Sequence, residues 1–104
     1  MEVVINKEGA ETIVSIKGRL DTNTTRDCEE KVMPIWEEDS INVCIDCSEL
    51  DYVSSAGLRL FLVLQKTTTA KKGSMRLSGM HKDVYDTFCL TGFNSILKIE
   101  NVQK

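Results

Sequence analysis

The feature that most restricts the fold of this 104-residue chain is a regular alternation between strand-like and helix-like periodicity. Two runs rich in β-branched residues, residues 3–6 and 12–17, lie on either side of Gly9 and predict a β-hairpin. Helix-like spacing then alternates with three more strand-like runs, which are residues 41–46, the segment through Met75 and Leu77, and residues 95–101. Such alternation favours a mixed, mostly parallel sheet with helices packed on it. We therefore predict an α/β fold with four to five strands in a single domain, residues 1–104.

The helices are predicted to begin near Thr22, Ala56 and Lys82. Thr22 or Asn23 would cap the first helix with a side-chain oxygen, and Gly92 would end the third helix. Pro34 lacks a backbone N–H and clashes with the preceding turn. It therefore predicts a kink or a break near the end of the first helix.

The apolar positions indicate which segments are buried. Residues 58–64 carry a wide apolar face, so we expect the second helix to be largely buried. Tyr52 and Val53 are assigned to the core or to a strand end. We also assign one late apolar group to the core, consisting of Phe88, Leu90, Phe93 and Ile96.

Composition and charge argue against several classes of function. Hydrophobic residues make up 41% of the chain and charged residues 28%, which is typical of a compact globular domain. The formal net charge of −3 would not attract a phosphate backbone, so nucleic-acid binding is not expected. No apolar stretch is long enough to cross a membrane, and the N-terminus lacks the pattern of a signal peptide. We expect a cytoplasmic protein without a membrane partner.

The four cysteines do not predict a disulfide or a metal site. Cys44 and Cys47 lie in a strand-like run, which would separate their Cα atoms by about 10 Å and point their side chains apart. Cys28 and Cys89 show no paired ligand spacing, and the single histidine, His81, is distant from them in sequence. We expect reduced, unpaired cysteines and no cofactor.

The segment "DYVSSAGLR", residues 51–59, places two serines between a strand-like and a helix-like run. A helix that begins near Ala56 would put Ser55 at its N-cap or in its first turn, where a serine oxygen can accept a backbone N–H. Ser55 as a hydrolase nucleophile would need a nearby base, and His81 opens a different predicted helix. We therefore do not expect an enzyme.

Three segments in this order, "GRLDTNT", "DYVSSAGLR" and "VYDTFCLTGFNSILKI", resemble a STAS domain of the anti-sigma factor antagonist type. The resemblance covers nearly the whole chain. It implies a regulator that binds an anti-sigma factor, which is also a serine kinase, and thereby frees a sigma factor. It further implies that phosphorylation of a serine in the turn switches the regulator off, and that a serine phosphatase resets it.

The resemblance also implies roles for individual residues. The family turn commonly reads Asp, Ser, small residue, Gly, Leu, with the acceptor serine directly after the Asp. Aligning Gly57 and Leu58 makes Ser55 the acceptor and places Ser54 where Asp is common. The partner-binding residues implied by this alignment are Asp21, Thr22, Ser54, Ser55, Ala56, Gly57 and Arg59.

Alternatives remain for several of these residues. Asp21 can equally be a helix cap or a partner contact, and Arg59 is also typical of a solvated helix face. Gly57, in the first turn, is interpreted as leaving the backbone uncovered for the approach of another molecule. The whole chain can alternatively be a STAS scaffold or ligand-sensing module in a larger signalling assembly, without reversible phosphorylation.

Overall fold

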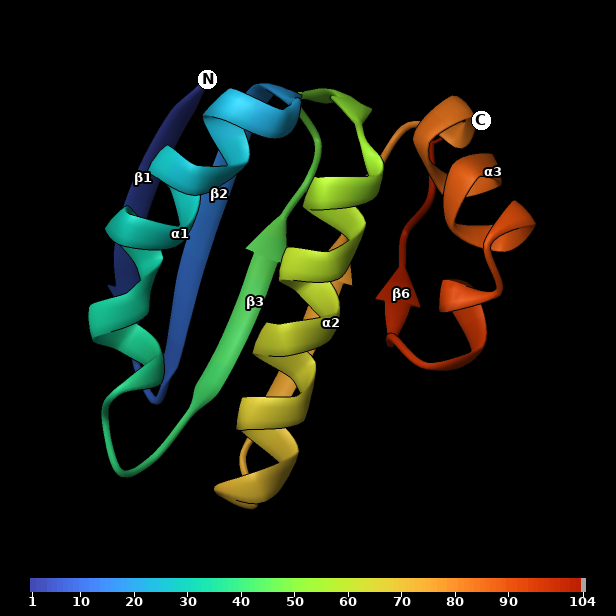
Figure 1. Ribbon diagram of the computed structural model, residues 1–104. Coiled ribbons are helices and arrows are strands. Elements are labelled where there is room, and N and C mark those ends of the chain that lie inside the picture. Colours follow the sequence, from blue (N-terminus) through green and yellow to red (C-terminus); the bar gives the residue numbers. More distant parts are fainter. Residues whose placement is uncertain (104) are drawn as a thin grey trace.

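The computed structural model describes residues 1–103, which form one mixed sheet with helices packed against it (Figure 1). The elements in chain order are β1 (Glu2–Glu8), β2 (Glu11–Leu20), α1 (Thr22–Trp36), β3 (Asn42–Asp46), β4 (Leu50–Val53), α2 (Ser55–Ala70), β5 (Ser74–Ser78), α3 (Lys82–Leu90), the 3-10 helix η1 (Phe93–Ser95) and β6 (Ile99–Glu100). The predicted α/β class and the three predicted helix starts are confirmed.

The strand order is β1-β2-β3-β5-β6, and only the β1–β2 pair is antiparallel. Gly9 adopts φ of 63° in the tight turn of the predicted β1–β2 hairpin. Helices α1 and α2 lie on the same face of the sheet, and both begin at the same end of it (Figure 1). This arrangement brings the two helix N-termini together.

Strand β4 was not predicted, and it explains how the sheet extends toward the helix N-termini. The first half of β2 pairs with β3, whereas its last residues pair with β4 after an irregularity at Gly18 and Arg19. Gly18 has φ of 95° and donates its N–H to the Glu49 carbonyl over 2.8 Å. With four residues, two of them exposed, β4 is too short for alternation to reveal it.

The core lies between the sheet and the helices. Its largest fully buried side chains include Trp36 of α1, Phe61 of α2 and Phe88 of α3. Trp36 donates its indole N–H to Thr68 Oγ1 over 2.9 Å, so the contact between α1 and α2 has one buried hydrogen bond. The rings of Phe61 and Phe88 lie 5.8 Å apart, which fixes α3 against α2.

The ends of α1 and α3 compare well with the sequence predictions. Helix α1 continues through Pro34 and ends two residues later, at Trp36, so the break occurs close to the predicted point. Lys71 Nζ donates to the carbonyl groups of Trp36 and Glu38, which occupies free acceptors beyond that end. Gly92 follows α3 with φ of 79°, as predicted for the residue that ends this helix.

The assignment of the late apolar group to the core was wrong for two of its four residues. Of the late apolar group, Phe88 is buried and Phe93 is partly buried, but Leu90 is 89% exposed and Ile96 is 50% exposed. Tyr52 and Val53 are the last two residues of β4, which confirms the strand-end alternative for them; Tyr52 is exposed and Val53 is buried. Helix α2 is exposed at Val63, so the wide apolar face is not fully covered. A small domain has too few elements to cover both sides of its peripheral helices.

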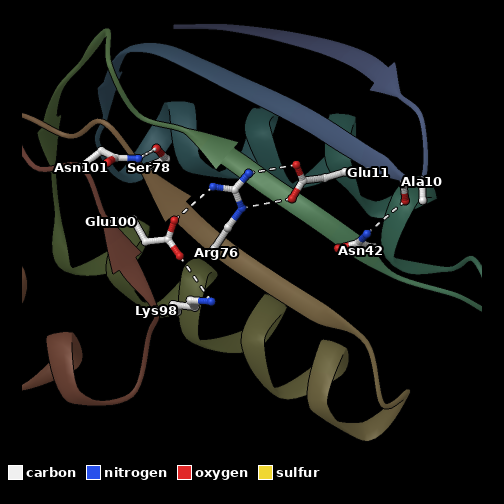
Figure 2. Close-up of polar contacts among 8 residues, drawn as sticks. All are labelled: Ala10, Glu11, Asn42, Arg76, Ser78, Lys98, Glu100 and Asn101. Carbon is white, nitrogen blue, oxygen red and sulfur yellow. Dashed lines mark hydrogen bonds and ion pairs between the residues drawn. The ribbon is translucent and has the colours of Figure 1, made fainter.

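The face of the sheet that carries no helix holds a cluster of ion pairs centred on Arg76 (Figure 2). The Arg76 guanidinium donates to both carboxylate oxygens of Glu11 and to Glu100, which also pairs with Lys98. These contacts hold the pKa values of Glu11 and Glu100 below their usual range. The cluster links β2, β5 and β6 on the face opposite the helices.

All four cysteines are unpaired. Burial raises the pKa of the Cys28 thiol to about 11, and it also raises the pKa values of Cys44 and Cys47. Across residues 1–103, no helix has both the length and the apolar character needed to span a membrane.

Candidate functional site

The candidate site is built where the C-terminal ends of β2 and β4 lie side by side. Leu20 pairs with Val53 in parallel register, and the Ser54 N–H donates to the Leu20 carbonyl over 2.8 Å. Each strand leads directly into a helix, α1 after Asp21 and α2 after Ser54. Asp21 and the serine turn therefore lie next to each other, although more than thirty residues separate them in sequence.

Asp21 is the N-cap of α1, which confirms the capping alternative for this residue, whereas the prediction of Thr22 or Asn23 as the cap was wrong. Its Oδ1 accepts the backbone N–H groups of Asn23 and Thr24 over 3.0 and 2.9 Å. The Asp21 N–H donates in return to Thr24 Oγ1 over 2.9 Å, which completes a capping box. Hydrogen bonds from Thr24, first from its backbone, lower the pKa of the Asp21 carboxyl. The carboxylate is a fixed negative charge at the edge of the turn.

The sequence left open whether Ser55 caps α2 or lies in its first turn, and the structure places the two serines in different positions. Ser54, which is half-buried, is the N-cap of α2, and its Oγ accepts the Gly57 N–H over 3.3 Å. Ser55 is the first residue of the helix and is exposed. In the described chain, residues 1–103, no histidine or carboxylate hydrogen-bonds the Ser55 hydroxyl. The cap is therefore Ser54, which leaves the Ser55 side chain free for another role.

Gly57 contacts its own domain rather than solvent, so its interpretation as uncovered backbone was wrong. The residue is buried, and a Cβ atom added to it would lie 2.9 Å from Val53 Cγ1 and 3.1 Å from Leu20 Cβ. A Cβ atom is essentially never found within 3.0 Å of such a neighbouring atom, and the contact with Leu20 would also be unusually tight. Only glycine lets the first turn of α2 pack so tightly on the ends of β2 and β4.

A groove of about 330 Å³ separates the first two turns of α1 from those of α2. Three of its lining residues were predicted as partner-binding residues, namely Thr22, Ala56 and Arg59. Arg26 and Glu29 of α1 also line it, and sequence reasoning missed both. Their position four and seven residues after Thr22 is the pattern that puts them on one helix face. Ser55 does not line the groove itself, but Ala56, the next residue of α2, and Arg59 form part of its wall.

A second pair missed from sequence is Arg19 and Tyr52. The Arg19 guanidinium carbon lies 4.3 Å from the centre of the Tyr52 ring, across the β2–β4 pair. Stacking of this kind holds an exposed aromatic ring in a defined orientation. The pair extends the exposed surface around the turn toward β4.

The fold and this strand-end turn define a class of protein. The chain belongs to the STAS domain family, whose model matches residues 2–103. BtrV of Bordetella bronchiseptica is 27% identical over 97% of this chain and 87% of its own length. The anti-sigma-B factor antagonist of Listeria monocytogenes is 26% identical over 86% of this chain and 79% of its own.

Solved structures agree on the fold. The anti-sigma factor antagonist SpoIIAA in its unphosphorylated form superimposes with a TM-score of 0.75. The match covers 94% of this chain and 87% of that one at 16% identity. The recognised family and the general fold predicted from sequence are therefore confirmed.

Proposed function

We propose that this chain is an anti-sigma factor antagonist, switched off by phosphorylation of Ser55. In the unmodified state it binds an anti-sigma factor that is also a serine kinase and so frees a sigma factor. The kinase transfers the γ-phosphoryl group of ATP to Ser55 Oγ, forming an O–P bond and releasing ADP and a proton. A serine phosphatase hydrolyses the phosphoester and resets the switch in the cytoplasm.

The observation that carries this proposal is the division of roles between the two serines. Ser54 holds the helix cap and is half-buried, whereas Ser55 is exposed and has no structural hydrogen bond to its side chain among residues 1–103. A kinase can modify Ser55 without breaking the cap. Serine at position 54 preserves the capping role that the Asp common in the family would also perform, since both are good N-caps.

The surface around Ser55 supplies the contacts for a partner. Asp21 contributes a fixed carboxylate, and Thr22, Ala56 and Arg59 contribute the adjoining wall of the groove. Ser54 completes the turn on the other side. Gly57 acts indirectly, by allowing the turn to pack in its observed position.

Phosphorylation would act on the partner rather than on the fold. A phosphate at the first residue of a helix gains about 0.3–1 kcal/mol from the helix dipole, so the domain should stay folded. Burying the new charge beside Asp21, against a partner shaped for a neutral hydroxyl, costs roughly 2–5 kcal/mol. At about 1.4 kcal/mol per tenfold, this lowers affinity by one and a half to three and a half decades.

The test uses the protein that co-purifies with this chain as the candidate kinase. After incubation with ATP, intact-mass measurement should show one added phosphate on the wild type and none on Ser55→Ala. Ser54→Asn is the matched control, because asparagine keeps the helix cap but has no hydroxyl, and this variant should still be phosphorylated. Ser55→Ala should bind the partner normally, and Ser55→Asp should bind 30-fold to 3,000-fold more weakly, within the roughly estimated range above.

Two results would count against the proposal. Equal labelling of Ser55→Ala and the wild type would move the modification to another residue. Binding of the partner without any mass change, over a range of ATP concentrations, would favour the STAS scaffold or ligand-sensing alternative.

A further inference from the structure

Two arginines line the groove between α1 and α2 from opposite sides, Arg26 from α1 and Arg59 from α2. Among residues 1–103, neither forms an ion pair, although seven other pairs do form on this domain. Glu29 also lines the groove but is not within ion-pair distance of either arginine. Two guanidinium groups thus share a small hollow with one carboxylate, which leaves an excess of positive charge.

Arg59 already lies over the first turn of α2. Its Nε donates to the Ser55 carbonyl oxygen over 3.4 Å, which is long for a hydrogen bond and easily exchanged. Ser55 and Arg59 are also four residues apart on one helix, so their side chains are neighbours on its surface. The guanidinium is therefore within side-chain reach of any group attached to Ser55 Oγ.

We infer that the groove between α1 and α2 is the binding site of the phosphoryl group on Ser55, with Arg59 as its direct partner and Arg26 on the far wall. This inference rests on the proposed function for how the phosphate arrives, and it adds where the phosphate goes. Guanidinium groups bind phosphate oxygens through two parallel N–H donors, which a single carbonyl acceptor does not use. The phosphate therefore replaces the long bond to the Ser55 carbonyl.

A phosphate bound in this groove would weaken partner binding in two ways. The added phosphate places negative charge next to Asp21, and it also occupies the two arginines that a partner would otherwise meet in the open groove. Attachment through Ser55 makes the contact intramolecular, with an effective concentration of roughly millimolar or more. Free anions at lower concentration should not fill the same groove.

The experiment places phosphoserine at position 55 of the full chain during synthesis, so that no kinase is needed. Phosphorus NMR then follows the second ionisation of the phosphate as pH is varied. The ordinary pKa of this step is about 6, and neighbouring arginines stabilise the dianion and lower it. The charged groups around the phosphate are Arg26, Glu29 and Arg59 of the groove, with Asp21 and Arg19 at the adjoining turn.

Four variants of the phosphorylated protein sharpen the result. Arg59→Gln should raise the phosphate pKa by about 0.3–1 unit, the reduced range that applies to an exposed, solvent-screened pair. Arg26→Gln should raise it by less, and Glu29→Gln should lower it. Lys66→Gln is the matched control, since Lys66 is exposed on the same helix but outside this groove, and it should leave the pKa unchanged.

Equal phosphate pKa values in the wild type, Arg59→Gln and Arg26→Gln would overturn this inference and leave the proposed function intact. Failure of the kinase to modify Ser55 would overturn the proposed function, but it would not affect the phosphate pKa values measured on the protein made with phosphoserine. Inorganic phosphate, added to the unmodified protein at the concentration used for the phosphorylated protein, should not shift the Arg59 Nε–H resonance. A shift as large as that in the phosphorylated chain would overturn the assignment to the attached group.

Discussion

The N-termini of α1 and α2 lie side by side, yet they are held by different forces. At α1, the Asp21 carboxylate accepts two backbone N–H groups and Thr24 completes a capping box. At α2, Ser54 accepts a single N–H over 3.3 Å, and the turn is fixed instead by the packing of Gly57 and by the backbone bond from Ser54 to Leu20. One helix end has its own negative charge, whereas the other has an uncharged cap and is fixed sterically.

The largest expected effect comes from disturbing the packing at α2. Gly57→Val should destabilise the domain by about 1–3 kcal/mol, because the new side chain meets Val53 and Leu20 at distances that force them to move. Urea unfolding measures this change. Gly57→Ala adds only the Cβ atom and gains about 1 kcal/mol of helix propensity. Its decrease in the free energy of unfolding should therefore be smaller than that of Gly57→Val. If both variants were more stable than the wild type, packing would not be what holds this helix end.

The next effect comes from removing the polar cap at α1. Asp21→Ala should lower the melting temperature by about 3–8 °C, because two N–H groups lose their acceptor. Asp21→Asn is the control that keeps a capping side chain without the charge, and it should melt close to the wild type. Thermal unfolding followed by circular dichroism measures this change. An Asp21→Ala variant that melts at the same temperature as the wild type would show that the capping box contributes little to stability.

Acid provides the same comparison without a mutation. Folding lowers the pKa of the Asp21 carboxyl from its ordinary value of 3.8. The ionised carboxylate therefore stabilises the folded state fully above pH 3.8, and this stabilisation is lost as pH falls through the folded pKa. Ser54 has no ionisable group. As pH is lowered, hydrogen exchange of the backbone amides should therefore increase at Asn23 and Thr24 at a higher pH than at Gly57.

The smallest effect is expected at the α2 cap itself. Ser54→Ala removes one long hydrogen bond and should cost about 0.5 kcal/mol, at the low end for N-cap substitutions. The midpoint of a urea titration should hardly move relative to that of Asp21→Ala. A loss from Ser54→Ala as large as that from Asp21→Ala would show that the two helix ends are held in the same way.

The elements of the fold could be predicted from sequence because their periodicities differ and turn residues separate them. The details that define the site depend on single positions. The sequence left the caps open between neighbouring residues, with Asp21, Thr22 or Asn23 for α1 and Ser55 at the N-cap or in the first turn of α2. Periodicity does not resolve a difference of one residue, and the structure places the caps at Asp21 and Ser54. With Ser54 as the cap, Ser55 is the first helical residue and is exposed.

Other features depend on contacts between segments distant in the sequence. The close approach of Gly57 to Leu20 requires the β2–β4 pairing, and β4 itself was too short to predict. Arg26 and Glu29 become part of the site only because α1 packs beside α2. The exposure of Leu90 could not be predicted either, because apolar spacing identifies a face but does not identify what covers it.

The tight packing of Gly57 also bears on how a kinase would recognise this domain under the proposed function. Ser55, the acceptor in our proposal, belongs to a turn fixed on two strand ends, so it cannot extend into an active site as a flexible segment would. Recognition then depends on the folded surface, including Asp21 from another part of the chain, and little conformational entropy is lost on binding. A free peptide of residues 51–62 would lack this surface, and it is too short to form a stable helix alone. If the proposed phosphorylation takes place, the specificity of the kinase should therefore depend on the fold and not on a linear motif.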